Sequence, residues 1–250
     1  MENTEIIYGK NPVDALLESN KRRINKIFIA KGIKYDEKIK RILSRAKEYK
    51  ISIHEIPREK LDNLTKGVHQ GIAASVAPIE FADFNELLKS LKNRTNALLI
   101  ILDKVEDPHN FGSIIRTAAS AGADGIIIAK RHSSPVTSTV EKASAGTIEL
   151  TPIVQASNIA NAIEKLKENN FWVIGAESSG EKYYFEQDYD MNCAIILGGE
   201  DQGISPLVAK NCDILVKIPM SNNVNSLNVS NAASILIYEI VRQRILKNKT

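Results

Sequence analysis

The feature that most constrains the fold is a series of short, continuous apolar runs in the later part of the chain. These runs are rich in β-branched residues and recur at residues 97–102, 125–129, 171–176, 194–197 and 214–218. Segments with helical spacing lie between the runs, as at 159–168, and after the last of them, at 229–246. Strands that are apolar on both faces and alternate with helices are typical of a mostly parallel sheet covered on both sides. We therefore expect an α/β domain at residues 96–250.

The first part of the chain has the pattern of a smaller α/β unit. Residues 36–49 place Ile39, Ile42 and Ala46 at the spacing of an amphipathic helix, and strands are expected on either side of it, at 24–30 and 51–56. Residues 81–95 are expected to form a linker that contains one short helix. The predicted organisation is an N-terminal domain at 1–80, a linker at 81–95 and a larger domain at 96–250.

Charge is distributed unevenly between these two parts. Residues 1–80 carry 16 Lys and Arg against 11 Asp and Glu, a net charge of +5, whereas residues 81–250 carry a net charge of −2. This asymmetry indicates that the first part contacts a polyanion. A merely solvated basic surface is the alternative that charge alone leaves open.

Several classes of protein are disfavoured. Cys193 and Cys212 lie far apart in the sequence, and the four histidines show no paired metal-ligand spacing, so we expect no metal site. No apolar run approaches the roughly 18 residues needed to cross a bilayer, and the N-terminus lacks the pattern of a signal peptide. We expect a cytoplasmic protein without a membrane partner.

Three segments that follow strands have an unusual composition. In the first, at 103–112, Asn110 is expected to cap a helix at 111–121, whose polar face carries Arg116. The alternative for this segment alone is a capping Asn and a solvated Arg. Ligands of open parallel sheets bind beyond the carboxyl ends of the strands, so such segments are the expected location of a site.

The second segment, at 198–206, has three glycines before Ser205 and Pro206, a pair that indicates the start of a helix. The third, at 219–230, is a long loop rich in Ser and Asn, which suits hydrogen bonding to a small polar ligand. Neither segment matches the glycine fingerprint of dinucleotide-binding proteins.

Together the three segments resemble the three motifs of the SpoU group of the SPOUT superfamily of RNA methyltransferases. The matching residues are Leu102-Asp103, Asp107-Pro108-His109-Asn110-Phe111-Gly112 and Arg116-Thr117-Ala118; Leu197-Gly198-Gly199-Glu200 and Gly203; and Ile218-Pro219-Met220 and Ser226-Leu227-Asn228-Val229-Ser230. The N-terminal segments Tyr8-Gly9-Lys10-Asn11-Pro12-Val13 and His69-Gln70-Gly71-Ile72 also resemble landmarks of one subgroup. That subgroup comprises the bacterial enzymes that 2′-O-methylate a guanosine in the P-site loop of 23S ribosomal RNA.

The resemblance implies a fold, a cofactor and an assembly. The larger domain would be a SPOUT domain with a deep trefoil knot, preceded by a small L30e-like α/β domain that binds the substrate, and the protein would be a homodimer. The cofactor would be S-adenosyl-L-methionine, held largely by main-chain groups. The residues implied for its binding are Leu197, Gly198, Gly203, Ile218, Met220 and Leu227.

The resemblance also implies the reaction, which is methyl transfer to a ribose 2′-hydroxyl. The residues that match the family's functional side chains are Asn110, Arg116, Glu200, Ser226 and Asn228. Arg116 is the family's proposed base, but a guanidinium normally stays protonated. We therefore also consider that Arg116 binds a neighbouring phosphate and stabilises the emerging alkoxide, with Asn110 and Glu200 orienting it.

The N-terminal domain would bind the RNA. Basic side chains that could contact phosphates there are Lys21, Arg22, Arg23, Lys26 and Lys66. The expected substrate is 23S ribosomal RNA. Transfer RNA, another ribosomal site, or a non-catalytic role in ribosome assembly are the alternatives.

Overall fold

The computed structural model describes residues 4–65, 67–200, 203–221 and 226–247. The chain divides into two compact units. Unit 1 comprises Met1–Glu80 together with Val136–Leu150, and unit 2 comprises Phe81–Pro135 and Thr151–Thr250. The segment 136–150, which sequence patterning assigned to the larger domain, therefore clusters with the N-terminal unit.

Unit 1 is built on a four-stranded sheet in the order β1-β4-β2-β3, in which only the β2–β3 pair is parallel. Its elements are β1 (Glu5–Tyr8), α1 (Lys10–Ser19), β2 (Ile24–Ala30), α2 (Glu37–Glu48), β3 (Ser52–Ile56), α3 (Arg58–Leu64), β4 (Ile72–Val76), α6 (Ser138–Ala143) and the 3₁₀ helix η1 (Thr147–Glu149). Helices α1 and α2 cover one face of the sheet, where Leu16, Ile27 and Ile39 are fully buried in one apolar cluster.

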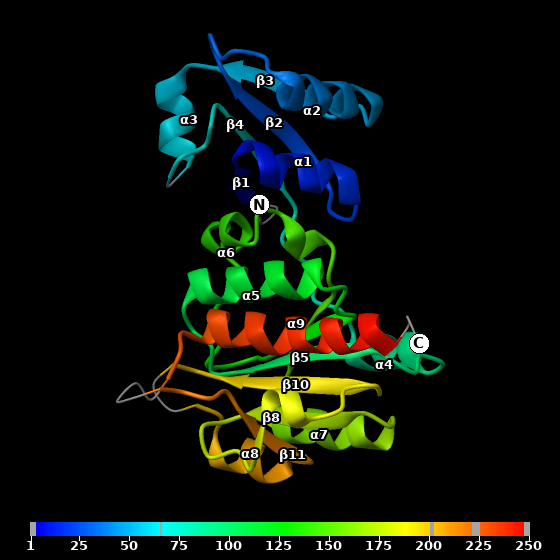
Figure 1. Cartoon of the computed structure of the whole chain (residues 1–250). Helices are drawn as coiled ribbons and strands as arrows, with labels where there is room; N and C mark the ends of the chain where they lie inside the picture. Colours follow the sequence, from blue (N-terminus) through cyan, green and yellow to red (C-terminus); the bar gives the residue numbers. More distant parts are fainter. Residues whose placement is uncertain (1–3, 66, 201–202, 222–225, 248–250) are drawn as a thin grey trace. The chain divides into compact units, whose positions relative to one another are not determined.

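Unit 2 contains a seven-stranded sheet in the order β7-β6-β5-β10-β8-β11-β9, in which every pair of neighbours is parallel. Its elements are α4 (Phe84–Leu91), β5 (Leu98–Asp103), α5 (Pro108–Ser120), β6 (Gly125–Ala129), β7 (Ile153–Ala156), α7 (Ile159–Glu168), β8 (Trp172–Ala176), β9 (Lys182–Tyr183), the 3₁₀ helix η2 (Tyr184–Glu186), β10 (Cys193–Gly198), α8 (Pro206–Asn211), β11 (Ile214–Lys217) and α9 (Val229–Lys247). Helices α5 and α9 pack together on one side of β5 and β10, and α7 and α8 lie on the other (Figure 1).

The parallel sheet predicted from the apolar runs is confirmed. Strands β5 and β10 are buried on both faces, because helices cover them from both sides. In the sheet β5 and β10 are neighbours, and β8 lies between β10 and β11. Because all these strands are parallel, the loops after β5, β10 and β11 leave the same edge of the sheet. In the described part of the chain, no helix is both long and apolar enough to cross a membrane.

A buried guanidinium ties the segment 136–150 into unit 1. Arg22 donates to Glu141 at 2.5 Å and to Glu149 at 3.0 Å, and its other terminal nitrogen donates to Glu5 at 2.6 Å. Arg22 also donates to the carbonyl of Ala77 at 2.7 and 3.0 Å. The side chains of Arg22, Glu141 and Glu149 are at most 5% exposed.

The burial of Glu141 and the other carboxylates around the Arg22 guanidinium change the pKa of Glu141. Burial, together with the neighbouring carboxylates Glu5 and Glu149, raises the pKa of Glu141 to about 7, although Arg22 opposes this shift. Because the folded chain then binds this proton more tightly than the unfolded chain, the stabilisation is complete below pH 4.5 and is lost as the pH rises to about 7.

We predict that Glu141→Gln makes stability less dependent on pH, because the amide cannot titrate. The wild-type free energy of unfolding should fall between pH 4.5 and pH 7 more steeply than that of the variant. Urea unfolding followed by circular dichroism over this range measures both slopes. Glu48→Gln, at an exposed position on α2, is the matched control. Equal slopes for wild type and Glu141→Gln would contradict the assignment.

Candidate functional site

The loop from β5 to α5 is held by an aspartate at each end. Buried Asp103 closes β5 and accepts a hydrogen bond from the Ser205 N–H at 2.8 Å. Asp107 caps α5, because it accepts from the Asn110 N–H at 2.8 Å and Pro108 takes the first helical position. The expectation that Asn110 caps this helix is therefore wrong. The helix begins at Pro108, which leaves the Asn110 side chain available to the site.

The loop after β10 folds back onto the end of its own strand. Gly203 donates to the carbonyl of Gly199 at 3.0 Å and has a φ of +62°. A Cβ atom on Gly198 would lie 1.9 Å from the carbonyl carbon of Gly203, and one on Gly199 would lie 2.4 Å from the carbonyl oxygen of Lys104. Glycine is therefore required at both positions by close backbone approach.

A network of polar side chains joins the three strand-end loops. Asn110, in the first turn of α5 after the first loop, and Asn228 from the third loop both donate to Glu200 Oε1 from the second, the latter at 3.2 Å. Asn228 also donates to Asn110 Oδ1 at 3.0 Å, and its own Oδ1 accepts from the N–H and hydroxyl of Ser230 at 2.9 and 2.6 Å. Three of the residues expected to be catalytic are thus in mutual contact.

A cavity of about 370 Å³ lies beside this network, within the range that binds small molecules. It is lined by Ala176, Glu177, Ser178, Leu197, Gly198, Gly199, Glu200, Gly203, Val216, Ile218, Met220, Ser226, Leu227, Val229 and Ala232. All six residues expected to bind the cofactor are in this set, as is Ser226, which was expected to be catalytic. Residues 222–225 of the third loop lie outside the described residues.

The chemistry of this cavity fits S-adenosylmethionine. Apolar side chains of Leu197, Ile218 and Leu227 can contact an adenine, and the glycines expose backbone groups that can replace its hydrogen bonds to water. Of the described residues on its wall, Glu177 and Glu200 are the charged ones, and their negative charge attracts a sulfonium. Among the described residues, no group of three or more His, Cys, Asp or Glu could hold a metal ion.

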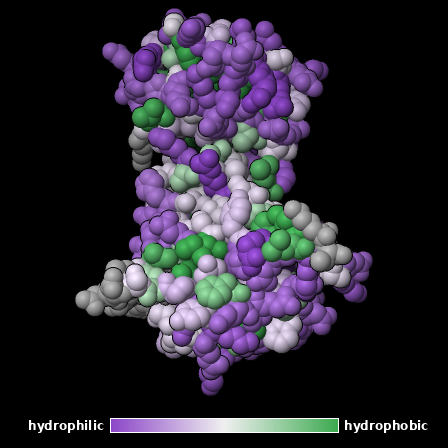
Figure 2. Space-filling view, viewed as in Figure 1, coloured by the Kyte–Doolittle hydropathy of each residue, from purple (hydrophilic) through white to green (hydrophobic). Residues whose placement is uncertain are grey.

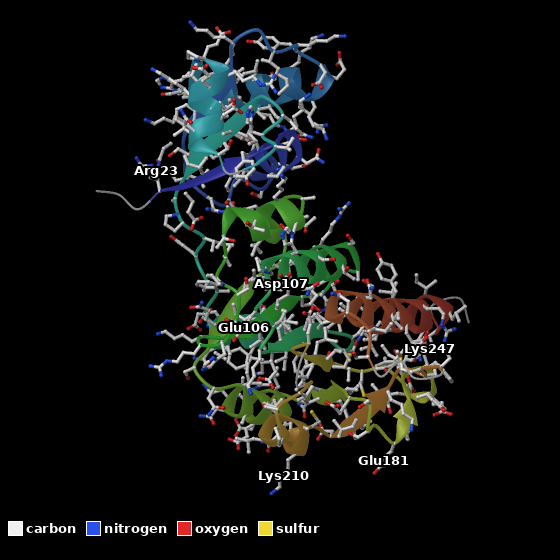
Figure 3. The ribbon with its side chains drawn as sticks, turned by 90° about the vertical axis from the view of Figure 1, so that its left-hand side faces the viewer. Arg23, Glu106, Asp107, Glu181, Lys210 and Lys247 are labelled. Carbon is white, nitrogen blue, oxygen red and sulfur yellow. The ribbon has the colours of Figure 1, made fainter. Side chains whose placement is uncertain are left out.

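A second cavity, of about 380 Å³, shares part of its wall with the first. The two have Gly199, Glu200, Gly203 and Val229 in common, and the second adds Lys104, Val105, Glu106, Asp107, Asn110 and His132. Glu106 and Asp107 lie close together at the start of α5 (Figure 3). Glu200, the acceptor of the polar network, therefore faces both cavities.

Arg116 is not part of this network. It is exposed on α5 and lines neither cavity. Within the described part of the single chain, Asn110 and Glu200 bond to each other and to Asn228, and no hydrogen bond joins either of them to Arg116. The expectation that these two side chains orient Arg116 is not met within one chain.

The basic residues expected to bind RNA all belong to unit 1 but differ in accessibility. Lys21, Arg23 and Lys26 are exposed, and Lys66 lies outside the described residues. Arg22 is buried and occupied by three carboxylates and a carbonyl, so its prediction as a phosphate contact is wrong. Arg22 lies in a basic run of the sequence, which favours an exposed side chain. Its partners Glu141 and Glu149 are so distant in the sequence that local patterns could not predict that Arg22 is buried.

Some residues at the cavities had no signal in the sequence. Glu177 and Ser178 follow β8, and Glu177 accepts from the Ile204 N–H at 3.2 Å. They reach the first cavity because β8 lies between β10 and β11, an order that periodicity does not encode. His132, which lines the second cavity, lies on the loop after β6, and that loop was not predicted to contribute to the site.

Comparison with known families matches both parts of the chain. Residues 97–238 match the SpoU rRNA Methylase family, and residues 6–82 match the family described as RNA 2′-O ribose methyltransferase substrate binding. A Staphylococcus aureus protein assigned to the TrmH family of tRNA/rRNA methyltransferases is 47% identical over 98% of both chains. A Staphylococcus haemolyticus protein with the same assignment is 46% identical over 96% of both.

Solved structures share the fold of the whole chain. The SpoU methyltransferase AviRb from Streptomyces viridochromogenes, in complex with AdoMet, aligns with a TM-score of 0.82 and 23% identity, covering 97% of this chain and 91% of that one. An AdoMet-bound rRNA methyltransferase from Sinorhizobium meliloti aligns with a TM-score of 0.79 and 23% identity, covering 96% and 87%.

The fold, the site and these similarities define an RNA methyltransferase that uses S-adenosylmethionine, with an N-terminal substrate-binding domain. The chain belongs to the SpoU family of RNA methyltransferases.

We predict that Gly198→Ala weakens S-adenosylmethionine binding by at least about tenfold, equivalent to about 1.4 kcal/mol. The added methyl group would collide with the Gly203 backbone, so the loop that lines the cavity must move. Isothermal titration calorimetry measures the affinity. Gly122→Ala is the matched control, because its Cβ would meet open space and only local strain results. Wild-type affinity in Gly198→Ala would contradict this account of the cavity.

Proposed function

We propose that the protein methylates the ribose 2′-hydroxyl of a guanosine in the P-site loop of 23S ribosomal RNA. The main support is the position of Glu200, which lies in the wall shared by two adjoining cavities and is held there by Asn110 and Asn228. The first cavity would hold the methyl donor and the second the target nucleoside. Such a substrate implies that the reaction takes place in the cytoplasm.

Each side chain of the network has a distinct role in this proposal. Bound S-adenosylmethionine supplies an electrophilic methyl group next to a positive sulfur. Glu200 would accept a hydrogen bond from the ribose 2′-hydroxyl and draw its proton away from the attacking oxygen. Asn110 and Asn228 hold the Glu200 carboxylate in place, so its orientation is fixed before the RNA arrives.

Ser226 and the main chain of Gly198, Ile218 and Leu227 would complete the donor site. All four residues line the cavity, where Ser226 and Leu227 are exposed and Gly198 and Ile218 are half-buried. Main-chain recognition of this kind is consistent with a trefoil knot that gathers the three loops, and we propose that unit 2 contains one.

We propose that Arg116 acts in a homodimer. It is exposed on α5, and the adjoining helix α9 exposes the large apolar side chains of Tyr238, Ile245 and Leu246. Apolar patches lie over the middle of unit 2, where α9 runs (Figure 2). An exposed apolar surface of this kind is typical of a protein interface. The guanidinium of Arg116 would bind a phosphate of the RNA and stabilise charge on the 2′-oxygen at a site completed by the partner.

The test of the function is to incubate the protein with labelled methyl donor and 23S ribosomal RNA from cells that lack the enzyme. We expect label on one ribose 2′-oxygen of a guanosine in the P-site loop, located by mapping the modified nucleotide. Label on a base would exclude ribose methylation. Label on transfer RNA or at another ribosomal site would retain the chemistry and reject the proposed target.

We predict that Arg116→Lys lowers the methylation rate by about 10²-fold or more, because a lysine cannot replace the two-pronged contact of a guanidinium. Single-turnover kinetics at saturating cofactor measure the effect. Arg94→Lys is the matched control, since Arg94 is exposed in the same unit and pairs with Asp124 at 3.3 Å. A normal rate in Arg116→Lys would reject both proposed roles of this residue.

A further inference from the structure

One face of the unit 1 sheet is only partly covered. Side chains alternate between the two faces of a strand, so residues 26, 28, 52, 54 and 75 lie opposite the face that α1 and α2 bury. Leu61 of α3 packs at one end of this second face, with Tyr8, Ala30 and Ala73. Between these contacts Lys26, Ser52 and His54 are exposed and Phe28 is half-buried. We refer to Lys26, Phe28, Ser52 and His54 as the open face; Ser75, which lies on the same side of β4, is buried.

An aromatic pair lies at the centre of the open face. Phe28 and His54 are register partners on β2 and β3, and their ring centroids are 6.2 Å apart at an interplanar angle of 43°. On the other side Phe28 is paired with Ala73 on β4. Phe28 also packs against the cluster of Tyr8, Ala30, Leu61 and Ala73, so its ring is half-buried there, and the exposed His54 lies beside it on β3.

The next row along the strands is polar and basic. Lys26 is the register partner of Ser52 on β3 and of Ser75 on β4, so it lies one side-chain repeat, about 7 Å, from Phe28. A shallow hollow at this end of the sheet is lined by Thr4, Arg23, Ile24, Asn25, Lys26 and Ser75. Arg23 lies at the rim of the unit (Figure 3).

The charge of this surface fits a polyanion. None of the strand residues that point to the second face is acidic. Lys26 supplies an exposed cation one side-chain repeat from Phe28, and the exposed Arg23 supplies another in the hollow at the end of the sheet. Asn25 lies at a bulge between Ile24 and Lys26, where the regular ladder is interrupted and an amide side chain is added to the hollow. Aromatic rings next to basic and amide side chains are the combination that binds unpaired nucleotides.

We propose that the open face binds a single-stranded segment of the RNA substrate, with an unpaired base stacked on Phe28 and His54 and the adjoining phosphates bound by Lys26 and Arg23. This rests on the proposed function, in which unit 1 binds the RNA. Stacking needs only the π-face of a base, so the open face holds a single strand, and selection of the target nucleotide stays with the cavities of unit 2.

The test uses the full-length protein and a fluorescein-labelled RNA of twelve uridines, with binding followed by fluorescence anisotropy. Phe28→Leu keeps an apolar side chain but removes the ring, and it should weaken binding by roughly 5- to 150-fold. Phe28→Tyr keeps the ring and should retain wild-type affinity. Tyr35→Leu, an exposed aromatic of unit 1 outside the open face, is the matched control and should bind as the wild type does.

Exposed His54 gives a second variant, at a position outside the buried core. His54→Ala should weaken binding in the same direction while leaving the melting temperature unchanged. In a plot of the logarithm of the binding constant against the logarithm of the salt concentration, Lys26→Ala should make the slope less steep by about 0.7. Wild-type affinity in both Phe28→Leu and His54→Ala would overturn the proposal.

Photocrosslinking locates the RNA directly and separates this proposal from the catalytic one. RNA carrying 4-thiouridine should crosslink to peptides that contain residues 26–28 or 52–54, and crosslinks found only elsewhere would overturn the proposal. Arg116→Lys should crosslink at the same peptides. A protein that crosslinks there but never methylates ribose would leave the open face intact and reject the proposed reaction.

Discussion

The candidate site in unit 2 depends on one carboxylate oxygen that accepts hydrogen bonds from two distant parts of the chain. Glu200 Oε1 receives the amides of Asn110 and Asn228, which come from the loops after β5 and β11. The three loops can meet because parallel strands end at the same edge and because β5 and β10 are neighbours. The close approach of the Gly198 and Gly203 backbones turns Glu200 back over the strand ends. Without that turn, Glu200 would not lie in the wall that the two cavities share.

Unit 1 contains a second point at which distant segments are tied together by charge. Arg22 holds Glu141 and Glu149 of the segment 136–150 beside Glu5 of β1. Removing one partner of such a buried pair leaves an uncompensated charge, which is strongly destabilising. The two sites use charge differently. The carboxylate of Glu200 stays exposed and can act on a ligand, whereas Glu141 and Glu149 beside Arg22 are buried and serve the fold.

Sequence patterning predicted the elements that depend on local periodicity. The apolar runs identified the parallel strands of unit 2, because strands covered on both faces must be continuously apolar. Three strand-end loops were singled out for their composition, and resemblance to a family identified Asn110, Glu200 and Asn228, which the structure brings together.

The features that were not predicted depend on long-range packing. The strand order, which places Glu177 at the cofactor cavity, follows from how crossovers pack and leaves no local signal. Arg22 was expected at the surface because its neighbours in sequence are basic, and only the tertiary fold supplies its carboxylates. The helix start at Asp107 was missed although Pro108 marks it, because Asn110 is also a good capping residue.

The central claim is that the strand-end loops of unit 2 form the S-adenosylmethionine site. Hydrogen–deuterium exchange of the full-length protein, with and without saturating cofactor, tests it most directly. The account predicts slower exchange in peptides covering residues 197–203 and 218–228, with residues 24–30 of unit 1 unaffected. Protection confined to unit 1 or to the far ends of the strands, with these loops unchanged, would contradict it.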